Sequence, residues 1–396
     1  MIYFNNAATS FPKPPEVIEA VKEYISSIPF HSARAGFDFE EEDVAFACRT
    51  KLAKLFNAPE PEQIVFTSGS TESLNLAIKG LELYKAHVVT TGIEHNSVIR
   101  PLKHLELDGK IKLTFVDCDA TSNISPESIK AAMKDNTKAV VVNHSSNVTG
   151  SILDLKAIAK IAHEHGAKLI VDASQSSGNV PINVSDWDID LLAFTGHKSL
   201  YGLQGIGGLY IKKGLNLKPL KVGGTGIKSD VLVQPPGMPI YYEAGTPNMP
   251  GIVSLNAGVG FVLEKGVDSI REHKASMVKR MINELKDYPE ITNYTISDKN
   301  SFANFCFTVD KMVPEEVGYV LESSYDIVVR TGLHCAPLLM KPLGVYPWGT
   351  VRVSPSYFST DDEITKFIEA MKEIVNVFVR KNKNVSEKKI EQEGCF

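Results

Sequence analysis

Short apolar runs alternate with helical segments through the first half of this chain. Such alternation favours a mostly parallel sheet with helices on both of its faces. The sequence therefore predicts the α/β fold class, with a mixed, mostly parallel sheet flanked by helices in a large domain. The predicted strands are 63–66, 87–91, 112–116, 139–143, 168–171, 189–195 and 207–211, and the predicted helices are 71–79, 97–106, 125–134 and 155–165.

The pattern changes after residue 251. A long helix is predicted over 252–285, followed by strands at 302–309 and 326–330 and helices at 314–322 and 361–380. We expect a large domain over 15–255 and a smaller α+β domain made of 1–14 and 256–380. The polar residues 381–396 are expected to form a flexible tail, and the segment 223–250, rich in Gly and Pro, an extended loop.

Composition excludes several classes of protein. The chain has 396 residues, a formal net charge of -5 and 43% hydrophobic residues, which fits a globular enzyme and argues against nucleic acid as a partner. No apolar run is long enough to span a membrane, and the N-terminus lacks the pattern of a signal peptide, so we expect a cytoplasmic location. The five cysteines are scattered without a Cys-x-x-Cys pair, which suits neither a disulfide framework nor a structural zinc site.

Lys198 is the first candidate for chemistry. It follows the apolar run 189–194 in the stretch Phe-Thr-Gly-His-Lys-Ser. Desolvation at the end of a buried strand can lower the pKa of a lysine enough to leave a nucleophilic amine. Such an amine can form a Schiff base with an aldehyde, for which pyridoxal phosphate is the candidate. A lone lysine is more often a solvated surface residue, so the assignment of Lys198 as a Schiff-base lysine depends on the residues around it.

Other polar side chains follow successive predicted strands. The hydroxyl-rich turn 67–71 opens a helix and could bind a phosphate, or be an ordinary N-cap. His95 could stack on a pyridine ring or be structural, and Asn147 could bind a phenolic oxygen or mark a turn. Asp172 could pair with a protonated pyridine nitrogen, with an N-cap or a metal ligand as alternatives. Ligands bind where the carboxyl ends of such strands meet, so we expect these side chains to lie together.

On these residues, and on the segment 3–9 at the N-terminus, the chain resembles the fold-type I pyridoxal-phosphate enzymes of the class V aminotransferase group. Within it the chain resembles the cysteine desulfurases, and among them the second group, which includes selenocysteine lyases. The resemblance implies that Lys198 forms the Schiff base and that Thr246 contacts the phosphate of the other subunit, in a homodimer with shared active sites. It further implies pyridine contacts from Asp172 and His95, phenolic-oxygen contacts from Asn147 and Gln175, and phosphate contacts from Ser70, Thr71, Thr195 and His197.

The resemblance implies substrate binding by Arg352 and Asn147, and a reactive thiol at Cys335. Arg352 matches the family arginine that binds the α-carboxylate of the substrate, although a surface arginine at a strand edge is the alternative. Cys335 is flanked by Arg330 and His334, and cations near a thiol favour its thiolate. The short gap between Cys335 and Arg352 resembles the second group of desulfurases. Two departures from the family are Asn5, where Asp is usual, and Leu333, where His is frequent.

The resemblance implies conversion of L-cysteine to L-alanine with a persulfide on Cys335, after Lys198 removes the α-proton and His95 shuttles a proton. The sulfur would pass to a separate acceptor protein, as in iron–sulfur cluster assembly. Alternatives are a selenocysteine lyase acting on L-selenocysteine, another pyridoxal-phosphate C–S lyase, and a class V aminotransferase that does not use Cys335. A non-catalytic protein that kept the fold, and a binding module built on the tail with Cys395, are further alternatives.

Overall fold

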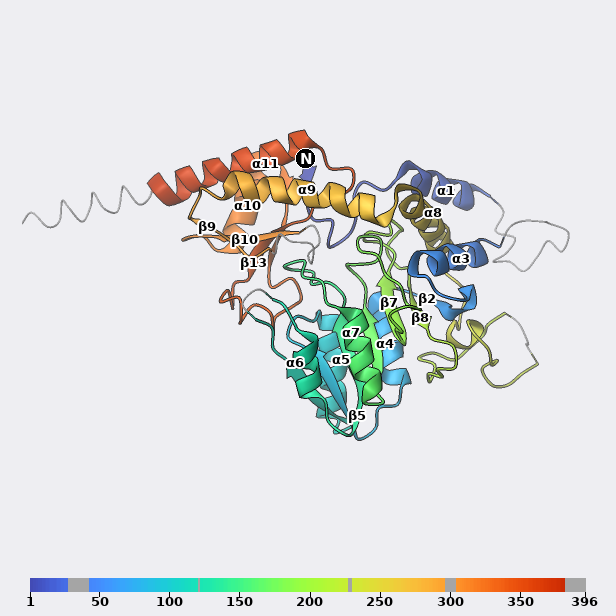
Figure 1. Ribbon diagram of the computed structural model, residues 1–396. Coiled ribbons are helices and arrows are strands. Elements are labelled where there is room, and N and C mark those ends of the chain that lie inside the picture. Colours follow the sequence, from blue (N-terminus) through green and yellow to red (C-terminus); the bar gives the residue numbers. More distant parts are fainter. Residues whose placement is uncertain (28–42, 120–121, 227–229, 296–303, 382–396) are drawn as a thin grey trace, which may run out of the picture.

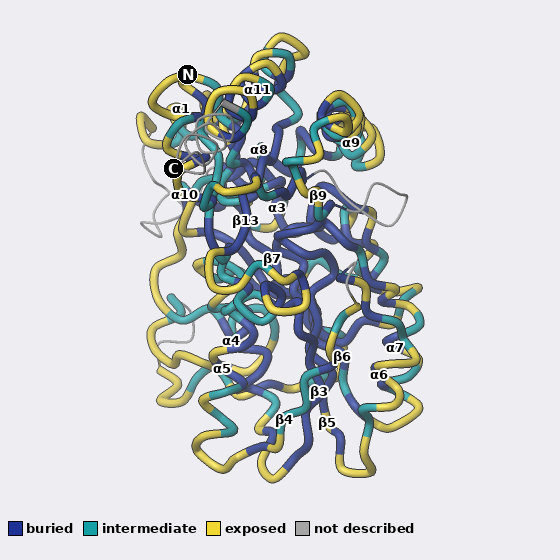
Figure 2. The backbone as a smooth tube through the Cα atoms, turned by 90° about the vertical axis from the view of Figure 1, so that its left-hand side faces the viewer, coloured by how far each residue is buried: buried dark blue, intermediate teal, exposed yellow. Residues whose placement is uncertain are grey.

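The computed structural model describes residues 1–27, 43–119, 122–226, 230–295 and 304–381. A seven-stranded sheet forms its centre, in the order β2-β8-β7-β6-β5-β3-β4 (Figures 1 and 2). The strands β3 to β7 pair in parallel, and β8 is antiparallel to both of its neighbours, which confirms the predicted mixed, mostly parallel sheet. The strands are β2 (Ile64–Thr67), β3 (Ala86–Thr91), β4 (Ile111–Val116), β5 (Thr137–Asn143), β6 (Lys168–Asp172), β7 (Leu191–Thr195) and β8 (Gly207–Ile211).

Helices cover both faces of this sheet because successive strand residues point to opposite sides. In β5, Val141 packs in the core beneath α4 (Ser70–Gly80) and α5 (Asn96–Leu107), whereas its neighbours Val140 and Val142 join the opposite core. That opposite core includes side chains of α3 (Val44–Phe56), α6 (Pro126–Ala132), α7 (Leu155–Glu164) and α8 (Met249–Lys265). The strands are dark blue at the centre of Figure 2 because they are buried on both faces.

A second, antiparallel sheet has the order β12-β13-β10-β9 and its own hydrophobic core. Phe4 belongs to this core, and β1 pairs in parallel with β11, so the N-terminus packs on the C-terminal part of the chain. The helices α9 and α11 lie side by side over these strands (Figure 1). The elements are β1 (Ile2–Tyr3), β9 (Ile291–Asn293), β10 (Phe305–Val309), β11 (Ile327–Val328), β12 (Arg330–Gly332), β13 (Thr350–Val353), α9 (Val267–Leu285), α10 (Pro314–Tyr325), α11 (Asp361–Ile374) and a π-helical turn, Val375–Lys381.

Two sequence predictions are wrong in detail. The single helix predicted over 252–285 is two helices, because Gly266 has φ 82° and ψ 133° and ends α8 before α9 begins. The single strand predicted over 326–330 is divided between β11 and β12, which belong to different sheets. The remaining elements are α1 (Pro15–Ser26) and two short 3-10 turns, Pro61–Gln63 and Ile240–Tyr242. The predicted flexible tail lies almost entirely outside the described residues.

Among the residues that the structure describes, no helix is both long enough and apolar enough to cross a membrane.

Candidate functional site

Nine of the predicted site residues line one cavity of about 230 Å³ at the carboxyl edge of the central sheet. The sheet brings them together because β3, β5, β6 and β7 run in parallel, and β2 points the same way as β7, both being antiparallel to β8. Segments far apart in sequence therefore end at one place. The nine residues are Ser70, Thr71, His95, Asn147, Asp172, Gln175, His197, Lys198 and Arg352.

Lys198 follows β7 and reaches into this cavity. Burial lowers the pKa of its amine to about 8, against the opposing effect of the negative charge on Asp172. The guanidinium groups of Arg352 and Arg330 lower that pKa further. A lysine with a lowered pKa has a substantial fraction of neutral amine near neutral pH, which is the nucleophilic form.

Asp172 is the last residue of β6 and is buried. Its Oδ1 accepts hydrogen bonds from the backbone N–H of Ser174, over 2.9 Å, and from the Ser174 hydroxyl. These bonds orient the carboxylate at the end of the strand. A buried carboxylate is stabilised by a cationic partner, and it faces the same cavity as Lys198.

His95 is the N-cap of α5. Its Nδ1 accepts a hydrogen bond of 3.1 Å from the backbone N–H of Ser97, so in the neutral ring the proton lies on Nε2. Burial, and then the positive charge of Lys198, lower the pKa of His95 to about 4. The imidazole is therefore neutral at neutral pH, with a flat apolar face and one N–H donor.

The N-terminus of α4 lies at one end of the cavity, where its backbone N–H groups could bind an anion. Ser70 and Thr71 are its first two residues, where backbone N–H groups have no partner within the helix. His197 lines the same cavity, its Nδ1 is buried without a hydrogen-bond partner, and burial lowers its pKa to about 4. Thr195 is not one of the residues that line the cavity. It lies next to Gly69, which precedes α4: a Cβ built on Gly69 would be 3.6 Å from Oγ1 of Thr195.

The donor set of this cavity fits pyridoxal phosphate. The amine of Lys198 suits its aldehyde, the N-terminus of α4 suits its phosphate, and Asp172 suits a protonated ring nitrogen. Buried polar atoms without partners are costly, and His197 Nδ1 and Asn147 Oδ1 are both in this state. A polar ligand in the cavity would satisfy them. Gln175, whose Nε2 donates to the backbone of Ala7 over 3.0 Å, completes the wall.

Arg352 lies on β13 and is fully buried, so the alternative of a surface arginine is wrong. Its Nη1 donates to the backbone oxygen of Asn147 over 2.7 Å, and its Nη2 donates to Oδ1 of Asn5 over 3.3 Å. Burial, and then the charge of Arg330, lower its pKa to about 9. Within the described part of the chain, no Asp or Glu forms an ion pair with Arg352. Asn5, which stands where the family usually has Asp, supplies a neutral oxygen, so it does not neutralise the guanidinium.

Cys335 lies in a backbone segment with unusual geometry. His334 and Cys335 have φ values of 50° and 59°, which non-glycine residues rarely adopt. The segment is held by hydrogen bonds from Asn147 Nδ2 to the His334 oxygen, over 2.7 Å, and from the Asn96 N–H to the Cys335 oxygen, over 2.8 Å. The Sγ of Cys335 accepts from Nη2 of Arg330 over 3.2 Å. Strained backbone of this kind persists where surrounding contacts fix it, often at functional sites.

His334 does not supply the positive charge expected of it. Its Nε2 lies 3.0 Å from Oγ1 of Thr350 and 3.1 Å from the backbone oxygen of the same residue. Burial holds the pKa of His334 well below its usual range, so the ring is neutral. Arg330 is therefore the cationic side chain in direct contact with the thiol, and the charges of Lys198 and Arg352 also interact with Cys335.

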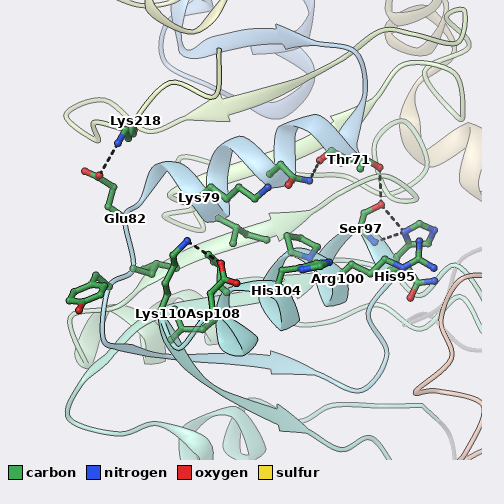
Figure 3. A pocket seen from close by; sticks show the side chains of 18 of the residues that line it. Thr71, Lys79, Glu82, His95, Ser97, Arg100, His104, Asp108, Lys110 and Lys218 are labelled. Carbon is green, nitrogen blue, oxygen red and sulfur yellow. Dashed lines mark hydrogen bonds and ion pairs between the residues drawn. The ribbon is translucent and has the colours of Figure 1, made fainter. Parts of the chain in front are cut away.

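Cys335 lines a second groove, of about 1100 Å³. Most of its lining comes from α4 and α5, including Thr71, Ser97 and His104 (Figure 3). This groove and the cavity of Lys198 share Thr71, His95 and Ser97, and the hydroxyls of Thr71 and Ser97 are 2.8 Å apart. The thiol therefore lies where the cavity meets a groove that leads away between the two helices.

Thr246 is not brought to this site within one chain. It is exposed and lines another pocket, of about 260 Å³, together with Glu72, Lys221 and Glu243. The prediction that Thr246 acts in a neighbouring subunit stays a prediction.

Sequence reasoning missed Glu94 and gave Arg330 only a minor part. Glu94 is fully buried, and its Oε1 accepts from the Thr91 hydroxyl, over 2.5 Å, and from the Asn143 N–H, over 2.9 Å. Burial raises its pKa to about 8, so this carboxyl is protonated at neutral pH. The one available signal was a carboxylate directly before His95 at a strand end.

Comparison with known proteins gives a consistent result. Residues 2–367 match the model of the family described as aminotransferase class-V. A probable cysteine desulfurase from Pyrococcus abyssi is 36% identical over 95% of this chain and 94% of its own length, and a cysteine desulfurase from Shigella flexneri is 30% identical over 94% and 93%. The apo structure of a cysteine desulfurase from Thermococcus onnurineus has a TM-score of 0.86 at 33% identity, covering 95% of this chain and 94% of that one. The chain therefore belongs to the class-V aminotransferase family, which depends on pyridoxal phosphate.

Proposed function

We propose that this protein is a pyridoxal-phosphate-dependent cysteine desulfurase that converts L-cysteine to L-alanine and holds the sulfur as a persulfide on Cys335. One observation carries the proposal. The Sγ of Cys335, 3.2 Å from Nη2 of Arg330, lies at the junction with the cavity that contains the amine of Lys198. The cysteine desulfurases among the relatives support the same activity.

The cofactor would be held by residues around the cavity of Lys198. Lys198 would bind its aldehyde, Asp172 its ring nitrogen, and His95 one face of its ring. Ser70, Thr71 and His197 would hold its phosphate, with Thr195 next to them beside Gly69, and Asn147 and Gln175 would hold its phenolic oxygen. Bound there, the cofactor supplies an electron sink for bond cleavage at the substrate carbons.

The substrate would be oriented by Arg352, whose guanidinium can bind the α-carboxylate through two parallel hydrogen bonds. The backbone oxygen of Asn147, 2.7 Å from Nη1, holds the guanidinium in place. Lys198, once free, takes the α-proton because its amine is partly neutral at neutral pH. His95, which carries its proton on Nε2, is placed to pass a proton within the cavity.

The sulfur step uses the thiolate of Cys335. It attacks the sulfur of the substrate, the S–S bond of the persulfide forms, and the C–S bond of the substrate breaks. The electron pair of the broken bond stays on the substrate carbon, which takes protons and leaves as L-alanine. Cysteine and a thiol become alanine and a persulfide, so the step balances without an external oxidant. Arg330 stabilises the attacking sulfur as an anion.

The wider context of the proposal follows the family resemblance. We infer a cytoplasmic homodimer in which Thr246 of each chain serves the other site, and a division into a large domain, 15–255, and a small one, 1–14 with 256–380. The separate core that Phe4 shares with α9, β10, β13 and α11 supports a small domain, although Ala336, Leu339, Met340 and Leu343 pack in the core of the central sheet. A sulfur-acceptor protein would approach Cys335 through the groove between α4 and α5.

The test is an assay of products from L-cysteine and, in parallel, from L-selenocysteine. The proposal predicts alanine and a persulfide on Cys335, detected by mass spectrometry, from L-cysteine. Alanine formed only from selenocysteine would favour a selenocysteine lyase instead. Pyruvate with free sulfide, or a keto acid, would contradict the persulfide step and indicate another C–S lyase or an aminotransferase.

A further inference from the structure

Two further lysines are connected by hydrogen bonds to the residues directly before and after Lys198. Lys13, from the segment before α1, contacts the residue that precedes Lys198. Lys274, from α9, is linked through one side chain to the residue that follows it. The flanking residues are His197 and Ser199, so the loop that carries the reactive amine is held from both directions.

The first contact is centred on the backbone oxygen of His197, which belongs to the peptide bond leading into Lys198. This oxygen accepts from the Ser10 N–H over 3.0 Å, from the Ser10 hydroxyl over 3.1 Å, from the Thr9 hydroxyl over 3.2 Å and from Nζ of Lys13 over 3.2 Å. Nζ of Lys13 also donates over 2.7 Å to the backbone oxygen of Gly202. Lys13 therefore joins the two ends of the turn 197–202.

The second contact runs through Asn179. Nζ of Lys274, a buried side chain, donates to Oδ1 of Asn179 over 2.9 Å. Nδ2 of Asn179 donates over 2.5 Å to the hydroxyl of Ser199 and over 2.8 Å to the backbone oxygen of Gln175. An amide has one donating and one accepting end, so the ammonium of Lys274 determines which end meets Ser199.

Both lysines have pKa values close to neutral pH, so a change of pH in this range changes their charge beside the site. Burial lowers the pKa of Lys13 to about 8 and that of Lys274 to about 8. The positive charge of Lys13 is one of the causes, after burial and Lys198, that lower the pKa of His197. Lys13 therefore acts on the site through its charge as well as through its hydrogen bonds.

We infer that Lys13 and Lys274 are positioning residues for Lys198, which hold the peptide groups before and after it so that its amine meets the cofactor in one orientation. The inference rests on the proposed function in one respect, that Lys198 binds pyridoxal phosphate. The stem of a lysine is flexible, so the position of its amine depends on how firmly its backbone is held. A loop ordered before the ligand arrives also reduces the entropy lost on binding.

The test compares Lys13→Met, Lys274→Met and the conservative Lys13→Arg in the full-length protein. Lys22→Met is the matched control, since Lys22 is exposed on α1 and pairs only with Glu19 among the described residues. Each protein is stripped of pyridoxal phosphate, and the rate of rebinding is followed by absorbance. The absorbance of the bound cofactor is then titrated against pH.

We expect rebinding to be about tenfold slower in Lys13→Met and in Lys274→Met, as the loss of a charged hydrogen bond predicts. The titration midpoint should move to higher pH in Lys13→Met, because removing a nearby positive charge favours the protonated form. Lys13→Arg should recover most of the rate and keep the midpoint, and Lys22→Met should match the wild type. Should Lys274→Met fail to fold, Asn179→Leu cuts the same link to Ser199.

Unchanged rebinding rates and midpoints in both methionine variants would overturn the inference. A lower melting temperature with the wild-type rate and midpoint would also overturn it, because it would leave the two lysines with a purely structural role. A wild-type protein that binds no pyridoxal phosphate would instead contradict the proposed function itself.

Discussion

Nη2 of Arg330 donates to Sγ of Cys335 over 3.2 Å, and the two residues are five positions apart in the sequence. The contact forms because the chain doubles back after β12, where His334 and Cys335 have positive φ values. Thr350, on the adjacent strand β13, holds the ring of His334 and so maintains this turn. A charge-assisted donor on the sulfur stabilises the thiolate, which is the nucleophilic form.

Arg330→Met should therefore make the thiol of Cys335 less reactive. We expect its alkylation by iodoacetamide at pH 7 to be about tenfold slower, because a hydrogen bond from a charged group is lost. The rate is measured by mass spectrometry of the peptide that contains Cys335. Cys118, half-buried and remote from this arginine in sequence, is the internal control, and an equal slowing at both cysteines would contradict the prediction.

Cys335→Ala should abolish alanine formation from L-cysteine and leave the absorbance of bound pyridoxal phosphate intact. The thiol lies in the groove between α4 and α5, outside the lining of the cavity that would hold the cofactor, so only the sulfur step is lost. Cys118→Ala serves as the control and should keep full activity. Undiminished alanine formation by Cys335→Ala would falsify the persulfide step.

Arg352→Lys should raise the KM for L-cysteine by about tenfold or more and change kcat less. An ammonium cannot reproduce the two parallel hydrogen bonds of a guanidinium to a carboxylate, and their loss weakens substrate binding. Steady-state kinetics at saturating cofactor measure the two constants separately. Arg280→Lys, a change at a half-buried arginine of α9 that pairs with Glu284, should leave both unchanged. A fall in kcat alone would place Arg352 in the chemical step instead.

The cofactor-free protein should lose stability as the pH falls below about 6.5. Burial lowers the pKa of His144 to about 3, and of His95 and His197 to about 4. Between those values and 6.5, the unfolded chain binds protons on these three rings that the folded chain does not. The protonated carboxyl of Glu94 acts in the opposite direction, but it is one group against three, so the free energy of unfolding falls with falling pH. The melting temperature between pH 4.5 and 7.5 measures this slope.

His144→Phe should flatten that slope, because one of the buried neutral rings is removed. His144 packs edge-on against Trp187, with ring centroids 5.6 Å apart, so a phenyl ring is a reasonable replacement. The exposed His104 supplies the control variant His104→Gln, which should keep the wild-type slope. An unchanged slope in His144→Phe would show that this ring does not contribute to acid sensitivity.

Gly266→Ala should destabilise the fold by about 1–3 kcal/mol, because an L side chain rarely adopts φ 82° with ψ 133°. A Cβ at this position would meet nothing within 4 Å, so the cost comes from the backbone alone. Gly224→Ala is the matched control: it also has open space, but no unusual φ, and should be nearly neutral. Urea denaturation measures both, and equal stabilities would contradict the role of Gly266 between α8 and α9.

Much of the fold and of the site follows from local sequence. Apolar strands that alternate with helices predict the sheet, and the rule that ligands bind at the carboxyl ends of its strands places Lys198, Asp172 and Asn147 at one edge. Gly266 shows the limit of such reasoning. The sequence prediction runs one helix across it, and its backbone angles show that the chain forms two.

Local sequence alone determined the order of the elements and the chemical groups available at their ends. The tertiary structure decided the state of those groups: Glu94 is protonated, His334 is neutral, and Arg352 has a neutral oxygen from Asn5 beside it. The pairing of Lys13 with the oxygen of His197 joins residues 184 positions apart. Charge state and long-range contact depend on how much protein surrounds each group. The packing of the whole chain produces that environment, so no single segment of the sequence determines it.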